Sequence, residues 1–187
     1  MPAVGNVEAS SSVRVACDAM CGGLARWLRV LGVDASWTPG IEDGELVRQA
    51  LAENRVIASS DGKMFERRVF TTRRLRAVRL PVGLKLLEQV RFVVRELDIT
   101  PGHPRCTACN GELTLVSRAE VGDVVPARTL IWAPDFCRCT ACGQVFWEGT
   151  HWRRIRAVRD RLMLEPRDET NPLTNPEGHW ENGHTTI

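Results

Sequence analysis

The sequence predicts an α/β domain with a mostly parallel sheet, followed by a small cysteine-rich unit. Between residues 13 and 100, short apolar runs typical of buried strands alternate with longer segments whose apolar residues recur at helical spacing. Strands and helices that alternate in this way form a mostly parallel sheet with helices on its faces. From residue 105 onward, two Cys-x-x-Cys pairs replace this alternation, which predicts a second and smaller unit built around them.

Each element of the first part is predicted from its own pattern. Short apolar runs predict four strands, over residues 13–17, 33–38, 55–59 and 75–80. Helical spacing predicts helices over residues 24–31, 43–51 and 86–97, and a short helix over residues 62–70. The first of these helices is closed by Gly32.

The rest of the chain divides by composition. Residues 1–12 are small and polar and predict a disordered leader, and residues 101–104 have the composition of a linker. The cysteine-rich unit is expected over residues 105–152, with hairpin strands at 113–116 and 130–132. A basic helix over 153–165 and a flexible tail over 166–187 are expected to follow.

Four cysteines predict a zinc site. They form two knuckles, Cys106-Thr-Ala-Cys109 and Cys139-Thr-Ala-Cys142, which are separated by 29 residues and are each followed by a turn-forming residue. Zinc binds four thiolate ligands in a tetrahedron. Two knuckles on neighbouring hairpins can supply these ligands even when the unit that carries them has no hydrophobic core. Cys137 is expected outside this tetrahedron, because Cys-x-Cys makes a poorer knuckle. The pattern predicts a zinc ribbon.

Cysteine usage also indicates the compartment. The chain has seven cysteines, an odd number, and residues 1–12 lack the basic start and apolar run of a secretory signal. We therefore expect free thiols in a reducing cytoplasm, with Cys17 and Cys21 as small core residues. No segment is long and apolar enough to cross a membrane, so no membrane partner is expected. The sequence does not predict an oligomeric state.

Three aspartates fall at junctions between predicted strands and helices. Asp18 follows the first strand, Asp61 follows the third, and Asp43 opens the helix between them. The carboxyl ends of parallel strands share one edge of a sheet, where ligands bind, so these carboxylates are placed to approach one another. Such a cluster can hold Mg²⁺ or Mn²⁺ and support phosphodiester cleavage.

A structural interpretation of the same residues stays open. Asp is a favoured helix N-cap, worth roughly 1 kcal/mol, and all three aspartates stand where a cap would stand. The pair Gly22-Gly23 just after Asp18 is equally ambiguous. It indicates either the close approach of a substrate or tight packing of the helix.

The basic residues are unevenly distributed. Residues 62–96 carry ten Lys or Arg against three Glu, a local balance of +7, within a chain whose net charge is only +2. This stretch is the best candidate for a phosphate track, which predicts RNA as a partner. Solvated arginine-rich helix faces are also ordinary. The candidate arginines are Arg67, Arg68, Arg73, Arg74, Arg76 and Arg79.

Four stretches of the chain resemble a known family. They are DAMCGGLARWLRVLGVD (18–34), EDGEL (42–46), RVIASSD (55–61) and CTACGQVFWEGTHW (139–152). Together they resemble the Mut-seven C-terminal RNase domain family, over residues 13–152. The resemblance implies a PIN-like nuclease fold with an attached zinc ribbon whose zinc is structural. It also implies a metal-dependent ribonuclease with catalytic acids at Asp18, Asp43 and Asp61.

The chain departs from the family pattern beside these acids. PIN-type sites often carry a fourth acid shortly after the third, whereas Asp61 is followed by Gly62-Lys63-Met64, and Glu66 is the nearest substitute. Gly23 stands where the family usually has a basic residue, and Cys21 stands where it has an aliphatic one. An alternative prediction is therefore a non-catalytic RNA- or protein-binding module with a degenerate site.

Overall fold

The computed structural model describes residues 13–149, 152 and 155–160. The predicted leader and flexible tail lie outside the described residues. Within the predicted basic helix, residues 155–160 are helical. In the part of the chain that the structure describes, no helix has both the length and the apolar character needed to span a membrane.

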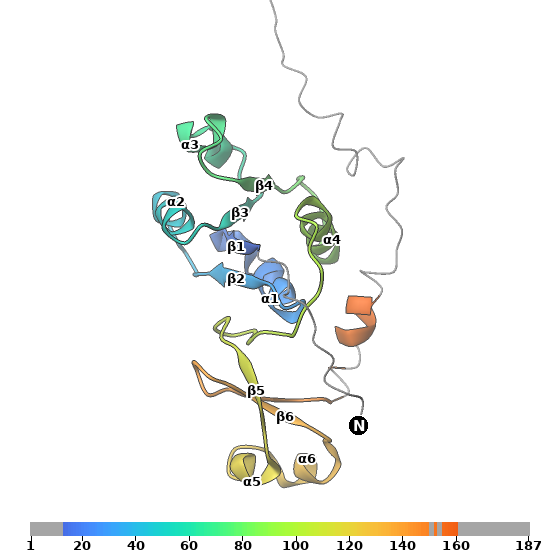
Figure 1. The fold of residues 1–187 in the computed structure, drawn as a ribbon. Helices are drawn as coiled ribbons and strands as arrows, with labels where there is room; N and C mark the ends of the chain where they lie inside the picture. Colours follow the sequence, from blue (N-terminus) through green and yellow to red (C-terminus); the bar gives the residue numbers. More distant parts are fainter. Residues whose placement is uncertain (1–12, 150–151, 153–154, 161–187) are drawn as a thin grey trace, which may run out of the picture.

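Four parallel strands form the sheet of the first part (Figure 1). The strand order is β2-β1-β3-β4, and each neighbouring pair is parallel. The sequence therefore predicted the α/β class and the parallel sheet correctly. The strands are β1 (Arg14–Cys17), β2 (Asp34–Trp37), β3 (Val56–Ser59) and β4 (Ala77–Arg79).

Helices cover both faces of this sheet, and the central strands β1 and β3 are accordingly apolar and buried over most of their length. Figure 1 shows α1 (Gly22–Val30) and α4 (Leu86–Glu96) on one side, and α2 (Asp43–Ala52) and α3 (Arg68–Thr71) on the other. Alternate strand residues therefore point to different cores: Val15 and Ala58 face α1 and α4, whereas Ala16 and Ile57 face α2.

Two short 3₁₀ helices follow strands at the carboxyl edge of the sheet. These are η1 (Ala19–Cys21) after β1 and η2 (Lys63–Glu66) after β3. The single helix predicted over residues 62–70 is thus divided into η2 and α3. The reason is Arg67, whose backbone is extended (φ −65°, ψ 141°) and so interrupts the helical turn.

The cysteine-rich part is a three-stranded antiparallel sheet with two short helices. Its strands, in spatial order, are β5 (Leu113–Val116), β6 (Phe136–Cys139) and β7 (Val145–Trp147). The helices α5 (Arg118–Val121) and α6 (Ala127–Trp132) lie between β5 and β6 along the chain. With the four cysteines, this arrangement confirms the predicted zinc ribbon as a fold.

One predicted strand of the ribbon is wrong. Residues 130–132 form the end of α6, and the hairpin partner of β5 is β6 instead. The helix begins after Pro126, whose φ of −56° suits a helix start. Leu130 packs against the core formed by Val121, Val125, Ala133 and Phe136. A short apolar run such as 130–132 fits a strand and a buried helical turn equally well, so its pattern does not distinguish them.

Candidate functional site

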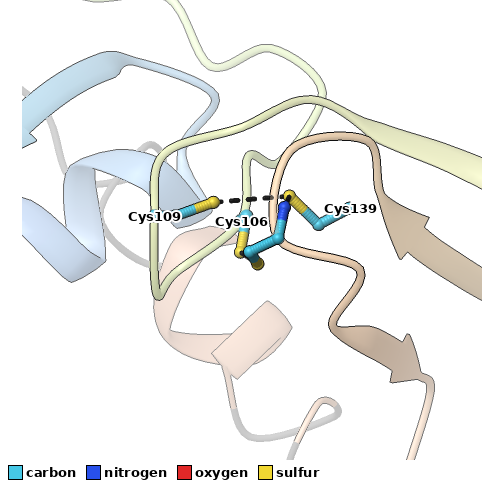
Figure 2. Close-up of side chains that lie close together, drawn as sticks. Cys106, Cys109 and Cys139 are labelled. Carbon is cyan, nitrogen blue, oxygen red and sulfur yellow. Dashed lines mark hydrogen bonds between the residues drawn. The ribbon is translucent and has the colours of Figure 1, made fainter.

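The four predicted cysteines converge on one point at the end of the ribbon. Figure 2 shows three of them, Cys106, Cys109 and Cys139. The Sγ atoms of all four lie within 4.8 Å of one another, with Cys106 and Cys142 at 3.7 Å and Cys109 and Cys139 at 3.4 Å. A tetrahedral zinc ion with Zn–S bonds of about 2.3 Å separates its sulfur ligands by roughly 3.8 Å. The thiols therefore fit such an ion, and Cys137 is not a member of the group.

The backbone around these thiols is shaped by tight turns. Asn110 and Gly143, which follow the two knuckles, both have positive φ angles of 72° and 75°. Gly111 has no room for a side chain, because a Cβ there would lie 2.7 Å from Cys139 Sγ. Burial acts to raise the pKa of Cys139, but hydrogen bonds from the backbone of Cys142 and Ala141 and from the Cys109 and Cys142 thiols together lower it to about 6. Burial raises the pKa of Cys106 to about 12, so the four thiols do not share one shift. A thiolate is the form that binds zinc.

The first knuckle is fixed to the α/β domain by a buried arginine. Arg29 in α1 is 2% exposed and donates hydrogen bonds to the backbone carbonyls of Thr107 (2.9 Å) and Ala108 (3.1 Å). It also donates to the carbonyl of Ala35 in β2 at 2.8 Å. The ribbon is therefore joined to the parallel sheet through the turn that carries two of the four cysteines.

A second contact ties the same knuckle to β2. The Asn110 side chain donates to Asp34 Oδ1 at 2.6 Å and accepts from the Ala35 amide at 3.1 Å. Asp34 Oδ1 also accepts from Arg55 at 2.7 Å. Burial acts to raise the pKa of Asp34, but the hydrogen bonds from Arg55, Asn110 and Arg14 outweigh it and lower the pKa to about 2. The carboxylate therefore stays charged in this contact.

Two of the three predicted catalytic aspartates follow neighbouring strands at the carboxyl edge of the parallel sheet. Asp18 follows β1 and is 4% exposed, and its Oδ2 accepts a hydrogen bond from Ser59 Oγ at 2.5 Å. The same Oγ accepts from the backbone amide of Asp61 at 3.0 Å. Ser59, the last residue of β3, therefore links the Asp18 carboxylate to the start of the Asp61 loop.

Both of these carboxylates also receive backbone donors of the following turn. Asp18 Oδ1 accepts from the Ala19 amide at 2.6 Å, and Asp61 Oδ1 accepts from the Lys63 amide at 2.9 Å. These bonds occupy one oxygen of each side chain and orient it at the sheet edge. The Asp18 bond is the N-cap contact that the structural interpretation expects, here at η1. The capping prediction is wrong for the other two aspartates, because Gly62 is the N-cap of η2 and Glu42 is the N-cap of α2.

Asp43 lies at the start of α2 and is held by a basic residue. Its Oδ2 accepts from Arg67 at 2.9 Å, an ion pair between side chains that are 34% and 45% exposed. Among the described residues, the four cysteines are the only group of three or more His, Cys, Asp or Glu side chains placed to share one ion. In this conformation the three aspartates are not gathered around a common point.

The remaining candidates are on the surface, but not all of them lie at this edge. Arg73, Arg74 and Arg76 precede β4 and therefore lie toward the opposite, amino edge of the sheet. Glu66 at the end of η2 is exposed and belongs to no group of acids placed to share an ion among the described residues. All six candidate arginines are also exposed, as a phosphate track requires. The sequence reasoning missed Ser59, although a hydroxyl at the last position of a buried strand is a signal that could have identified it.

Packing explains the glycine pair. A Cβ on Gly22 would lie 2.6 Å from the Trp37 ring, and a Cβ on Gly23 would lie 3.1 Å from Leu86. The Trp37 indole also donates to the Ala19 carbonyl at 2.9 Å, which holds the ring under η1. Of the two interpretations left open by the sequence, tight packing of α1 is the one the structure supports.

Comparison with known proteins identifies the family to which this chain belongs. The sequence profile of the Mut7-C RNAse domain family matches residues 13–159. The chain is also 36% identical to a human protein named "Exonuclease mut-7 homolog", in an alignment that covers 87% of this chain and 28% of that protein. The chain thus spans less than a third of the curated relative it matches. Because the family match takes in the parallel sheet and the zinc ribbon together, the chain belongs to the Mut7-C RNAse domain family.

Proposed function

We propose that the chain is a divalent-metal-dependent ribonuclease that hydrolyses RNA phosphodiester bonds at the carboxyl edge of its parallel sheet. The observation that carries this proposal is the Ser59 hydroxyl, which joins the Asp18 carboxylate to the Asp61 loop across two neighbouring strand ends. Family membership supports a nuclease function for the same domain. Asp18, Asp61 and Asp43 are the proposed catalytic acids.

The acids have the oxygen ligands that Mg²⁺ and Mn²⁺ prefer, but they are not gathered around one point in the described conformation. The Asp43–Arg67 ion pair accounts for part of this separation. It is a surface pair, and such pairs contribute about 0–1 kcal/mol. Its opening therefore costs little, and the Asp43 carboxylate remains available to a cation.

The chain itself contributes orientation and charge to the proposed reaction. Asp18 is nearly buried, and each of its oxygens accepts a hydrogen bond, from Ala19 and from Ser59. This fixes the carboxylate before a substrate arrives, which is the property that preorganised catalytic groups require. A bound Mg²⁺ or Mn²⁺ would supply an activated water and neutralise charge on the phosphate.

The zinc site is proposed to be structural. Four thiols surround one point and leave no position for a substrate or water, as in structural zinc sites. Its connection to α1 and β2 through Arg29 and Asn110 gives it a supporting role for the sheet. All seven cysteines are free thiols, which suits the reducing cytoplasm that we propose as the compartment.

RNA is the proposed substrate because the matched family is an RNAse domain family and because the stretch 62–96 exposes arginines, whose phosphate contacts dominate nucleic-acid affinity. Single-stranded RNA presents its backbone and bases more openly than a paired helix does. We therefore place single strands or loops in the site, with Arg67, Arg68, Arg73, Arg74 and Arg76 as candidate contacts.

A cleavage assay tests this function. Purified zinc-loaded protein is incubated with end-labelled single-stranded RNA in Mn²⁺, in Mg²⁺ and in EDTA. We expect cleavage with either divalent ion and none in EDTA. Asp18→Asn is expected to lower the rate by about a hundredfold or more, whereas the exposed ribbon variant Asp123→Asn keeps the wild-type rate. Equal cleavage by wild type and Asp18→Asn would remove Asp18 from the mechanism.

A second function is favoured by a specific observation. Glu66 is exposed and the three aspartates stand apart, so the described conformation lacks a complete four-acid cluster. A non-catalytic RNA- or protein-binding module would show this arrangement. RNA binding without cleavage in Mn²⁺ or Mg²⁺ would identify this second function.

A further inference from the structure

Three polar side chains stand in a row across the carboxyl edge of the sheet. Ser59 of β3 is paired with Arg79 of β4, and Asp18 directly follows Cys17, the residue of β1 that pairs with Ala58. Paired residues of parallel strands project to the same face. Along these strands that face is the one covered by α2, because Ala16, Ile57 and Ala77 precede the row on it. The order across the edge is therefore carboxylate, hydroxyl, guanidinium.

The Arg79 side chain is held beside the Asp61 loop by two neighbours. Its Cζ atom lies 5.9 Å from the centre of the Phe65 ring, a cation–π distance. A Cβ on Gly62 would lie 3.0 Å from one terminal nitrogen of the guanidinium, so the group rests against the backbone that follows Asp61. Phe65 is itself packed into the second core. Arg79 is therefore positioned by the fold rather than freely extended.

The charge of Arg79 has no carboxylate partner within the described part of the chain. Neither the ion pairs nor the side-chain hydrogen bonds found among the described residues include it, in contrast to Arg67, which is paired with Asp43. Its guanidinium is exposed on the surface. An exposed and prepositioned guanidinium offers two parallel N–H donors, which match two oxygens of one phosphate group.

We propose that Arg79 binds a phosphate group of the RNA strand at the end of the Asp18–Ser59–Arg79 row. This inference rests on the proposed function. It assigns to Arg79 the contact that holds the phosphodiester beside Asp18 and Asp61. Arg79 contacts the substrate, whereas Ser59 only positions the acids. The aromatic ring of Phe65 lowers the entropy cost of the contact because it already restricts the arginine.

The test separates this contact from cleavage. Binding of fluorescein-labelled oligouridine is measured in EDTA over a range of salt concentrations for wild type, Arg79→Gln, Arg79→Lys and Arg48→Gln. Arg48 is an exposed residue of α2 that pairs with Glu45, so Arg48→Gln is a matched loss of charge away from the edge. Circular dichroism melts of each variant establish that it is folded.

We expect Arg79→Gln to weaken binding by about fivefold to tenfold and to reduce the salt dependence by about one released counterion. Arg79→Lys should retain the salt dependence and recover only part of the affinity, because an ammonium group does not bind a phosphate through two parallel donors. Arg48→Gln should match wild type. In Mn²⁺, Arg79→Gln should also lower kcat/KM for RNA cleavage by at least the loss in affinity.

The outcomes are distinguishable from failure of the proposed function. If wild type does not cleave RNA but Arg79→Gln still weakens binding and lowers the salt slope, the ribonuclease proposal fails and the phosphate contact stands. If Arg79→Gln binds oligouridine with the wild-type affinity and salt slope, the Arg79 proposal is overturned, whether or not the protein cleaves RNA.

Discussion

At the scale of single residues, Ser59 connects the two strand ends that carry candidate acids. Its side chain is fully buried, donates to Asp18 and accepts from the amide of Asp61. One hydroxyl therefore gives a hydrogen-bond partner both to the Asp18 carboxylate and to the Asp61 amide, which belong to two of the proposed catalytic residues. Its loss should affect stability and catalysis together.

We expect Ser59→Ala to lower the free energy of unfolding by about 1–3 kcal/mol, because it leaves a buried carboxylate oxygen without this donor. It should also raise the Mn²⁺ concentration needed for half-maximal cleavage, since Asp18 would no longer be held in place. Urea unfolding and a Mn²⁺ titration of cleavage measure the two effects. Ser60→Ala, at the neighbouring and more exposed position, is the control and should change neither quantity much.

The sequence predicts where the acidic residues lie along the strands and helices, but it does not predict which side chains they contact. The positions of Asp18 and Asp61 at strand ends follow from the apolar pattern alone. The Asp43–Arg67 ion pair does not, because it depends on how α2 and the loop before α3 pack across 24 residues of chain. Local pattern locates a residue on an element, but only the packed fold shows which side chain it meets.

At the scale of elements, the contact between β2 and the first knuckle shows how the ribbon is attached. Asp34 at the start of β2 accepts from Arg14, Arg55 and Asn110, and these bonds hold its charge. Its pKa is lowered to about 2 from an ordinary value of 3.8. A carboxylate with a lowered pKa stabilises the folded state above its unfolded pKa, and this stabilisation is lost as the pH falls through the folded pKa.

Acid unfolding tests this contact. The shift corresponds to at most about 2–3 kcal/mol at neutral pH, and to less because the Asp34 side chain is 24% exposed and partly screened. We expect Asp34→Asn to be less stable than wild type at pH 7, and the difference to close as the pH falls from about 4 toward 2. Urea unfolding at several pH values measures it. A difference that is independent of pH would contradict a charge-based role for Asp34.

Element prediction failed where apolar runs are short. The strands of the parallel sheet were recognised because helical segments of a different period separate them. Residues 130–132 form a run too short to show either a strand or a helix period. The expected strand is instead the end of α6, which begins after Pro126. In the same way, residues 62–70 contain no residue that predicts a break, so the sequence predicts one helix there. The extended backbone of Arg67 divides it into two.

At the scale of the whole molecule, the α/β domain and the ribbon are joined at the turn that carries Cys106 and Cys109. Figure 1 shows the ribbon sheet extending away from the parallel sheet, with β2 and α1 nearest to it. Arg29 and Asn110 make this connection over separations of 75 to 79 residues along the chain. Such long-range pairs cannot be deduced from one sequence, whereas the Cys-x-x-Cys spacing identifies all four ligands locally.

Removal of zinc is expected to loosen the ribbon first. Thiol-rich sites contribute folding free energy directly, and the ribbon has only a small core of its own. With a chelator, amides of β5, β6 and β7 should lose protection from hydrogen exchange, while those of β1 and β3 stay protected. Exchange measured with and without chelator checks this. Equal loss of protection in both sheets would mean that the two parts unfold as one unit.

The central claim is that Asp18 and Asp61 form the catalytic edge of a metal-dependent ribonuclease. The most direct measurement is the Mn²⁺-supported rate of RNA cleavage by the double variant Asp18→Asn/Asp61→Asn, loaded with zinc and shown by circular dichroism to be folded. We predict that cleavage by wild type depends on Mn²⁺ and that the double variant falls to the rate of the EDTA control. Cleavage by the folded double variant at the wild-type rate would contradict the claim.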